Sequence, residues 1–156
     1  MSQLDKELIW EMHLPVASMS VSSASMTNIY VKRRQELILV VDDDPCVKDV
    51  TRDILERYGH SVLTASSRGA ALECCEQRGR ELAIVLLDET VLEPDIAGVL
   101  RRITEMNPAI KVIITSIYSS GWNPSRVQES GAAGFLRKPY RMTDLLKMVE
   151  QVQQIQ

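Results

Sequence analysis

The chain has 156 residues, of which 45% are hydrophobic and 25% are charged, and this composition predicts one soluble domain of ordinary size. Its formal net charge of −3 argues against a general nucleic-acid binder. No apolar run approaches the ~18 residues of a membrane span. Three cysteines without the spacing of a metal site, and an N-terminus without a convincing secretory signal, favour a cytoplasmic chain.

The first 35 residues differ in composition from the rest. Residues 17–28 (ASMSVSSASMTN) are rich in Ser, Met and Thr and show no clear period, which is typical of a linker. We therefore predict an N-terminal extension over residues 1–35 and a single domain over residues 36–156.

Short apolar runs alternate with amphipathic stretches from Leu37 onward. Continuous apolar runs suit strands that are buried on both faces of a parallel sheet. The runs are LILVV (37–41), SVLTA (61–65), LAIVLL (82–87), IKVIIT (110–115) and AGFL (133–136). Between them, apolar residues recur at intervals of three and four, as in Val47, Val50 and Ile54, which predicts helices. This β-α order, repeated five times, predicts an open parallel sheet with helices on both faces.

Side chains that can do chemistry stand at the ends of the predicted strands. The first strand is followed by Asp42 and Asp43, and the third by Asp88. The fourth strand ends at Thr115, and Lys138 follows the fifth. In open α/β sheets, function collects outside the carboxyl ends of the strands, which lie at one edge. We therefore expect these acids, the hydroxyl and the amine to meet in one crevice.

This combination of side chains favours phosphoryl chemistry. Close carboxylates remain ionised together only when a cation joins them, and Mg²⁺ takes such oxygen ligands. Asp88 stands alone at the end of the central strand and is the predicted nucleophile, which would become an aspartyl phosphate. Asp42 and Asp43 are predicted to hold the metal, while Lys138 and Thr115 compensate the charge of the phosphoryl group.

Four motifs, in this order and at these spacings, resemble the receiver domain of two-component response regulators across about residues 36–154. They are VVDDDP, LLD ending at Asp88, IITS ending at Ser116 and GFLRKP ending at Pro139. The resemblance implies a flavodoxin-like, doubly wound (βα)5 sheet with strand order 2-1-3-4-5 and five flanking helices. It also implies that a histidine kinase or a histidine phosphotransfer protein phosphorylates Asp88, so that the chain is a phosphoacceptor signalling domain and not an enzyme.

The resemblance further implies roles for individual residues. The implied contacts to Mg²⁺ are direct for Asp43, Asp88 and the backbone carbonyl of Thr90, and through water for Asp42. Thr115 and Phe135 match the paired switch positions of the family. Their movement would reshape the face built by the fourth helix, the fifth strand and the fifth helix for a protein output partner.

The loop after Asp88 departs from the family pattern and motivates one alternative. Receivers commonly carry Met-Pro where this chain has Val91 and Leu92, and Glu89 adds a negative charge beside the acceptor. Glu89 either points to solvent or disfavours a phosphoryl anion. The alternative is a degenerate receiver that binds its partners without phosphorylation.

A second alternative is a phosphatase of the haloacid dehalogenase type. Asp42-x-Asp44 after an apolar strand resembles the opening of that family, with Asp42 as nucleophile and Asp44 as general acid. That family expects Thr or Val where this chain has Cys46, and a further acidic pair that nothing after Lys138 supplies. Without that role, Asp44 before Pro45 is expected to be the N-cap of a helix.

The sequence allows two interpretations of how the predicted domain passes its signal on. No DNA-binding or catalytic segment follows the predicted domain, which suggests either a single-domain regulator that acts by protein contact or a receiver cut from a larger chain. The stretch EMHLPVAS resembles the last strand of histidine-kinase ATP-binding domains. Together with NPAIKVIITS and GFLRKPY, it suggests the terminal receiver of a hybrid histidine kinase. We expect no contact with nucleic acid or with a membrane.

Overall fold

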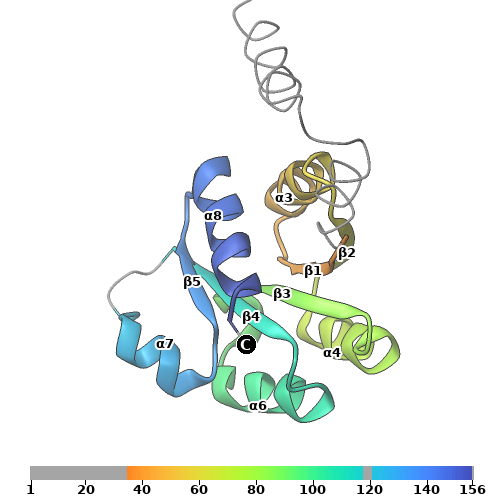
Figure 1. Cartoon of the computed structure of the whole chain (residues 1–156). Helices are drawn as coiled ribbons and strands as arrows, with labels where there is room; N and C mark the ends of the chain where they lie inside the picture. The colour runs from red at the N-terminus through yellow and green to blue at the C-terminus, as the bar shows by residue number, and fades with distance from the viewer. Residues whose placement is uncertain (1–34, 118–120, 156) are drawn as a thin grey trace, which may run out of the picture. The chain divides into compact units, whose positions relative to one another are not determined.

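A parallel sheet of five strands forms the centre of the protein. The computed structural model describes residues 35–117 and 121–155, so the predicted extension over residues 1–35 lies outside it except for its last residue. Within that part of the chain, the strand order is β2-β1-β3-β4-β5, which confirms the predicted α/β fold (Figure 1). The strands are β1 (Leu37–Val41), β2 (Ser61–Ala65), β3 (Leu82–Asp88), β4 (Lys111–Ser116) and β5 (Gly134–Arg137).

Helices cover both faces of this sheet (Figure 1). On one face, α3 (Pro45–Arg57) and α8 (Met142–Gln153) pack over a cluster that includes Ile38 and Val40 of β1. On the other face, α4 (Arg68–Arg78), α6 (Ile96–Met106) and α7 (Pro124–Ser130) pack over a cluster that includes Leu39 and Val41. Successive side chains of a strand point to opposite faces. Because both faces are covered, the central strands β1 and β3 are almost entirely apolar, whereas the edge strand β2 carries the exposed residues Ser61 and Thr64.

Polar caps and glycines define where the helices begin and end. The side chains that accept a first-turn N–H are Asp44 for α3, Ser67 for α4, Asp95 for α6 and Asn123 for α7. Each satisfies a donor that has no partner within its own helix. Gly131 ends α7 with a φ of 84°, a left-handed conformation that glycine adopts without steric cost.

A short additional helix follows the central strand directly. The resemblance implied five flanking helices, whereas the residues that the structure describes form six, because α5 (Glu89–Leu92) turns immediately after Asp88. Leu92 is fully buried in the core on the α4–α6 side, so the segment folds back against the protein instead of extending into solvent. Within the described ranges, no helix has the length and apolar character needed to cross a membrane.

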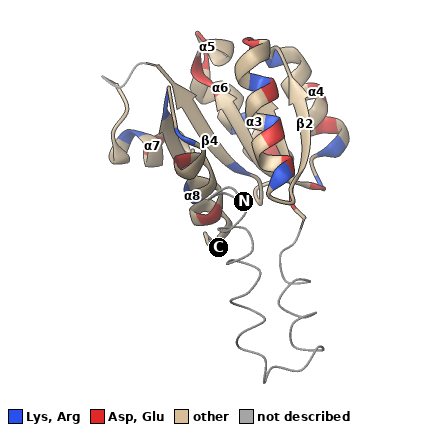
Figure 2. Cartoon of the chain, turned by 90° about the horizontal axis from the view of Figure 1, so that it is seen from above, with Lys and Arg blue, Asp and Glu red and all other residues tan. Residues whose placement is uncertain are grey.

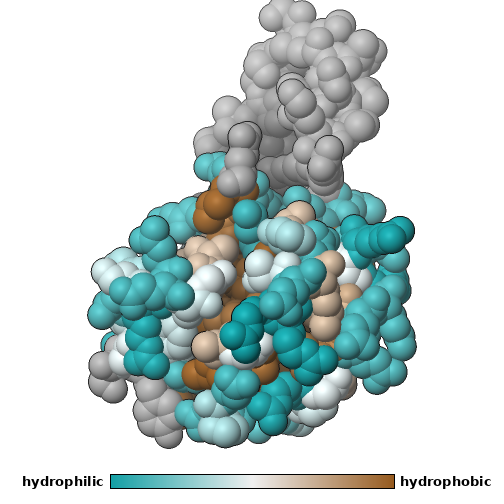
Figure 3. Space-filling view, turned by 90° about the horizontal axis from the view of Figure 1, so that it is seen from below, coloured by the Kyte–Doolittle hydropathy of each residue, from teal (hydrophilic) through white to brown (hydrophobic). Residues whose placement is uncertain are grey.

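Two further features lie on the surface of the protein. Lys and Arg residues alternate with Asp and Glu residues along α3, so that helix carries mixed charge (Figure 2). An open groove of about 740 Å³ lies where α6, β4, α7 and β5 meet, and its lining includes Ile110, Val127, Trp122 and Phe135. Apolar surface between hydrophilic residues is visible on the face seen from below (Figure 3).

Candidate functional site

The ends of the strands bring together side chains that are far apart in the sequence. Asp42 follows β1, Asp88 is the last residue of β3, and Lys138 follows β5. The backbone N–H of Asp42 donates to the carbonyl of Ala65 at 3.1 Å, and that of Lys138 donates to the carbonyl of Ser116 at 2.8 Å. These bonds continue the pairing of the sheet just beyond its strands. The three side chains therefore start from one edge, as the strand pattern predicts.

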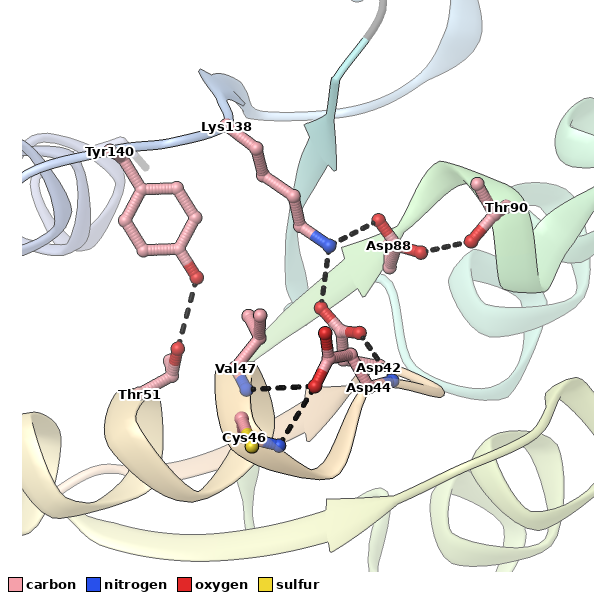
Figure 4. A network of polar contacts seen from close by, with 9 residues as sticks. All are labelled: Asp42, Asp44, Cys46, Val47, Thr51, Asp88, Thr90, Lys138 and Tyr140. Atoms are coloured by element: carbon pink, nitrogen blue, oxygen red, sulfur yellow. Dashed lines mark hydrogen bonds and ion pairs between the residues drawn. The ribbon is translucent and has the colours of Figure 1, made fainter.

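The ammonium group of Lys138 lies between the carboxylates of Asp42 and Asp88 (Figure 4). Its Nζ is 2.6 Å from Oδ2 of Asp42 and 2.7 Å from Oδ1 of Asp88. Burial lowers the pKa of Lys138, but the hydrogen bonds to the two carboxylates and their negative charges outweigh burial, so the pKa is raised overall. The lysine is therefore a fixed positive charge at neutral pH.

Asp42, Asp43 and Asp88 form a cluster in which each residue offers one carboxylate oxygen. These three oxygens all lie within 4.8 Å of one another. Ligands 2.0–2.1 Å from Mg²⁺ place opposite oxygens of an octahedral site about 4.2 Å apart. The three oxygens thus fit a hard divalent cation after a small movement of the carboxylates towards one another. Asp42 and Asp88 are each only 3% exposed, whereas Asp43 lies at the surface, so the site is open on one side.

Asp44 belongs to the start of α3 and not to the acidic cluster. Its Oδ1 accepts the backbone N–H groups of Cys46 at 2.9 Å and Val47 at 3.4 Å. Its own N–H donates to Oδ1 of Asp42 at 2.9 Å, which orients that carboxylate. The predicted N-cap is confirmed. This use of the side chain supports a structural cap and not the general acid of a phosphatase.

Thr90 contacts Asp88 through its side chain. The hydroxyl of Thr90 donates to Oδ2 of Asp88, the oxygen that Lys138 does not bind (Figure 4). The sequence suggested only the backbone carbonyl of Thr90, as a metal ligand, and that role stays a prediction. The hydroxyl contact was missed, although a threonine two residues after the predicted acceptor could have indicated it.

The two predicted switch residues lie on β4 and β5. Thr115 is buried and pairs in register with Asp88 across the β3–β4 ladder. Phe135 pairs with Ile114 and is partly buried. Its ring stacks on that of Trp122, with centroids 5.6 Å apart and planes 17° apart. The structure therefore places Thr115 beside the end of the central strand and Phe135 against a loop tryptophan, while their switching roles stay predictions.

Glu89 is buried, and the expectation that it points to solvent is wrong. It is 8% exposed, and its carboxylate accepts the indole N–H of Trp122 at 2.8 Å and the hydroxyl of Ser116. These donors come from the end of β4 and from the connection between β4 and α7. Nothing in the sequence pattern paired Glu89 with a tryptophan 33 residues away.

Tyr140 anchors the segment that carries Lys138. Its hydroxyl oxygen lies 3.0 Å from Oγ1 of Thr51, a buried residue of α3 (Figure 4). Burial raises the pKa of Tyr140, so the phenol stays neutral. The Lys138–Pro139 peptide bond is cis. The position of the lysine is thus fixed by contacts on both the strand side and the helix side.

Comparisons with known proteins agree with this arrangement. The model of the response regulator receiver domain family matches residues 38–150. The transcriptional regulatory protein ZraR of Escherichia coli O157:H7 is 35% identical over 113 residues, which are 72% of this chain and 25% of ZraR. The sensor histidine kinase AruS of Pseudomonas aeruginosa is 28% identical over 152 residues, which are 92% of this chain and 14% of AruS. The chain therefore spans a quarter or less of these two relatives.

A solved structure shows the same architecture. A response regulator receiver domain protein from Clostridium thermocellum is 28% identical, with a TM-score of 0.68, and the alignment covers 75% of this chain and 93% of that one. The matched family segment contains the sheet, the acidic cluster and Lys138. Neither the phosphatase nor the degenerate receiver is favoured, since the match is to receivers and the acidic residues are present. This chain belongs to the response regulator receiver domain family of two-component systems.

Proposed function

We propose that Asp88 is the residue on which this receiver accepts a phosphoryl group from a phosphohistidine, with Mg²⁺ held by Asp42, Asp43, Asp88 and the backbone carbonyl of Thr90. The observation that carries the proposal is the position of the Lys138 ammonium, 2.7 Å from Asp88 and 2.6 Å from Asp42 in a cluster of three carboxylates. A buried carboxylate at a strand end, flanked by a fixed ammonium and an oxygen-rich cation site, is equipped to bear a transferred anion.

The contacts of Asp88 define the transfer step. A carboxylate oxygen of Asp88 forms a bond to phosphorus while the bond between phosphorus and the imidazole nitrogen breaks, and that electron pair stays on the nitrogen. Lys138 already contacts Oδ1 of Asp88, so its ammonium is within reach of an oxygen on the attached phosphoryl group. Thr90 holds Oδ2 and fixes the plane of the carboxylate.

Charge balance supports a divalent cation in the same place. The three carboxylates and the Lys138 ammonium carry two net negative charges, which one divalent cation neutralises. When bound, Mg²⁺ supplies positive charge to the oxygens of the incoming phosphoryl group. Asp43, as the exposed member of the cluster, faces the side from which a donor protein can approach.

Thr115 and Phe135 are the residues that we propose to respond to phosphorylation. Thr115 lies next to Asp88 across the ladder, so its hydroxyl needs only a short movement to reach a phosphoryl oxygen. Phe135 lies on the neighbouring strand β5, one residue before Leu136, the partner of Thr115 in the β4–β5 ladder. A shift at Thr115 therefore acts on β5 and on the face formed by α7, β5 and α8, to which we assign the protein output partner.

Membership of the family supports a proposal for the phosphoryl donor and for the wider context of the chain. A histidine kinase or a histidine phosphotransfer protein supplies the phosphoryl group, and AruS, which is named a sensor histidine kinase, is a relative over 92% of this chain. That extent favours a receiver from a hybrid histidine kinase over a single-domain regulator. We place the chain in the cytoplasm, with protein partners and no nucleic acid or membrane contact of its own.

The experiment is phosphorylation with a small acyl phosphate and Mg²⁺, followed by intact mass spectrometry of the parent and of Asp88→Asn. We expect one phosphoryl adduct on the parent, none on Asp88→Asn, and none on the parent when EDTA replaces Mg²⁺. Asp53→Asn is the matched control, because Asp53 is an exposed acid of α3 whose contact is to Arg52. An adduct of equal yield on Asp88→Asn would contradict the proposal.

A further inference from the structure

Glu89 is a buried carboxylate that the transfer step does not use. It follows the acceptor Asp88 directly and is held by two neutral donors, the indole N–H of Trp122 at 2.8 Å and the hydroxyl of Ser116. Among the contacts that the structure describes, no cation pairs with it. A buried charge that is stabilised only by neutral hydrogen bonds is sensitive to any further negative charge placed beside it.

Trp122 connects Glu89 to the start of α7. The indole is 9% exposed, and the guanidinium carbon of Arg126 lies 5.0 Å from the ring centroid. Arg126 also donates to the carbonyl of Gly121 at 2.7 Å. Asn123, the next residue after Trp122, caps α7 by accepting the N–H of Arg126 at 2.8 Å. The indole is therefore in contact with the first turn of α7 through Arg126.

The same indole forms part of the groove between α6 and α7. Trp122 stacks on Phe135, and both residues line that groove. One face of the indole thus contacts Phe135, the proposed switch residue. Its N–H donates to Glu89, the residue after Asp88. The contact between Glu89 and Trp122 joins the site of chemistry to the surface of the protein.

We propose that Glu89 is a positioning residue that holds Trp122, and with it the start of α7, as a latch, and that a phosphoryl group on Asp88 opens this latch. The inference rests on the proposed function of Asp88. Phosphorylation replaces the single negative charge of the carboxylate with a group that carries about two. The added charge is one residue from Glu89 in a region of low exposure, so repulsion moves the Glu89 carboxylate and weakens its bond to the indole.

The test uses Trp122 as its own reporter. The chain has two tryptophans, so Trp10→Phe leaves Trp122 as the sole source of indole fluorescence. The full-length Trp10→Phe protein is treated with Mg²⁺ and acetyl phosphate, and emission, acrylamide quenching and intact mass are measured on the same sample. We expect the emission to shift to longer wavelength and the quenching to rise as the adduct forms.

Two substitutions separate the charge of Glu89 from its hydrogen bond. Glu89→Gln keeps an oxygen for the indole but removes the charge, so the resting spectrum should match the Trp10→Phe parent while the shift on phosphorylation is lost. Glu89→Ala removes the acceptor, so its resting emission should already be shifted to longer wavelength. Glu93→Gln is the matched control, because Glu93 is an exposed acid at the end of the same short helix, and it should respond like the parent.

The outcomes are distinguishable. If the parent forms no adduct, the proposed function of Asp88 is overturned. The proposed opening of the Glu89–Trp122 contact is then overturned as well. If the adduct forms but the emission of Trp122 does not change, or if Glu89→Gln responds as fully as the parent, the latch is overturned while the acceptor role stands. Equal resting spectra for Glu89→Gln and Glu89→Ala, with native circular dichroism, would overturn the contact itself. A purely structural role for Glu89 predicts no difference between Glu89→Gln and Glu93→Gln.

Discussion

Lys138 shows how one side chain fixes the geometry of the site. Its ammonium bonds two carboxylates that leave different strands, and the side chain is only 14% exposed. Without that ammonium, the carboxylates of Asp42 and Asp88 would face each other in a region of low dielectric constant, where like charges repel strongly. The lysine therefore stabilises the fold at the site where we propose that the phosphoryl group is accepted.

We expect Lys138→Met to lower the free energy of unfolding by about 1–3 kcal/mol at pH 8 without Mg²⁺, because it removes a charged donor from two buried acids. The folded-state pKa of Lys138 is raised above 10.5. The stabilisation is therefore fully present below pH 10.5 and is lost as the pH rises through the raised value. Urea unfolding of parent and variant across this range should show the two converging at high pH.

Lys147→Met is the control for this substitution, because Lys147 is an exposed lysine of α8. It should unfold like the parent at each pH. A stability difference for Lys138→Met that stays constant from pH 8 to the highest pH tested would show that the effect comes from lost packing and not from the charge.

The convergence of acids and lysine could be predicted from the sequence, whereas their close neighbours could not. Asp42, Asp88 and Lys138 each follow an apolar run, and the topology of a parallel sheet alone brings such positions to one edge. The contacts of Glu89 and Thr90 depend on how a four-residue helix turns after β3. That turn is set by tertiary packing of Leu92, and four residues are too few to show a helical period.

At the scale of elements, the ends of the helices are set by capping residues that can be recognised in the sequence. Asn123 caps α7 and Gly131 ends it with a positive φ, so both boundaries of that seven-residue helix follow from single residues. The strands were equally predictable, because runs such as LILVV have to be buried on both sides. The strands β3, β4 and β5 each end one residue later than the predicted runs, since backbone pairing continues past the last residue of each run.

We expect Gly131→Ala to destabilise the protein by about 1 kcal/mol and Gly69→Ala to stabilise it by roughly 0.5 kcal/mol. Neither added Cβ meets another atom within 4 Å, so neither variant suffers a clash. The two differ in backbone conformation: Gly131 has a φ of 84°, whereas Gly69 lies within α4. Paired urea unfolding curves measure both values. A change of the same sign in both variants would contradict the backbone explanation.

At the scale of the whole molecule, we expect the acidic cluster to make the free energy of unfolding depend on divalent cations. Two net negative charges are concentrated where β1, β3 and β5 end. A ligand that binds only the folded state raises the free energy of unfolding by RT ln(1 + [L]/Kd). For Mg²⁺ at ten times its Kd, this is about 1.4 kcal/mol.

We expect Mg²⁺ to raise Tm by roughly 3–8 °C relative to EDTA in the parent. Asp43→Asn should reduce this rise, because Asp43 is part of the cluster. Asp44→Asn is the control: it removes the same charge from the next residue, and asparagine still caps α3. Thermal unfolding followed by circular dichroism measures the shift. Equal responses of Asp43→Asn and Asp44→Asn to Mg²⁺ would place the cation elsewhere.

The hydrogen bond between residues 42 and 138 spans almost the entire domain, because 96 positions separate its partners in the chain. A polypeptide that stops before β5 possesses every acid of the cluster but lacks its balancing ammonium. During synthesis, the last strand must therefore leave the ribosome before the carboxylates at the ends of the first and third strands can pair with the ammonium. The acids and their balancing ammonium therefore come together only late in synthesis.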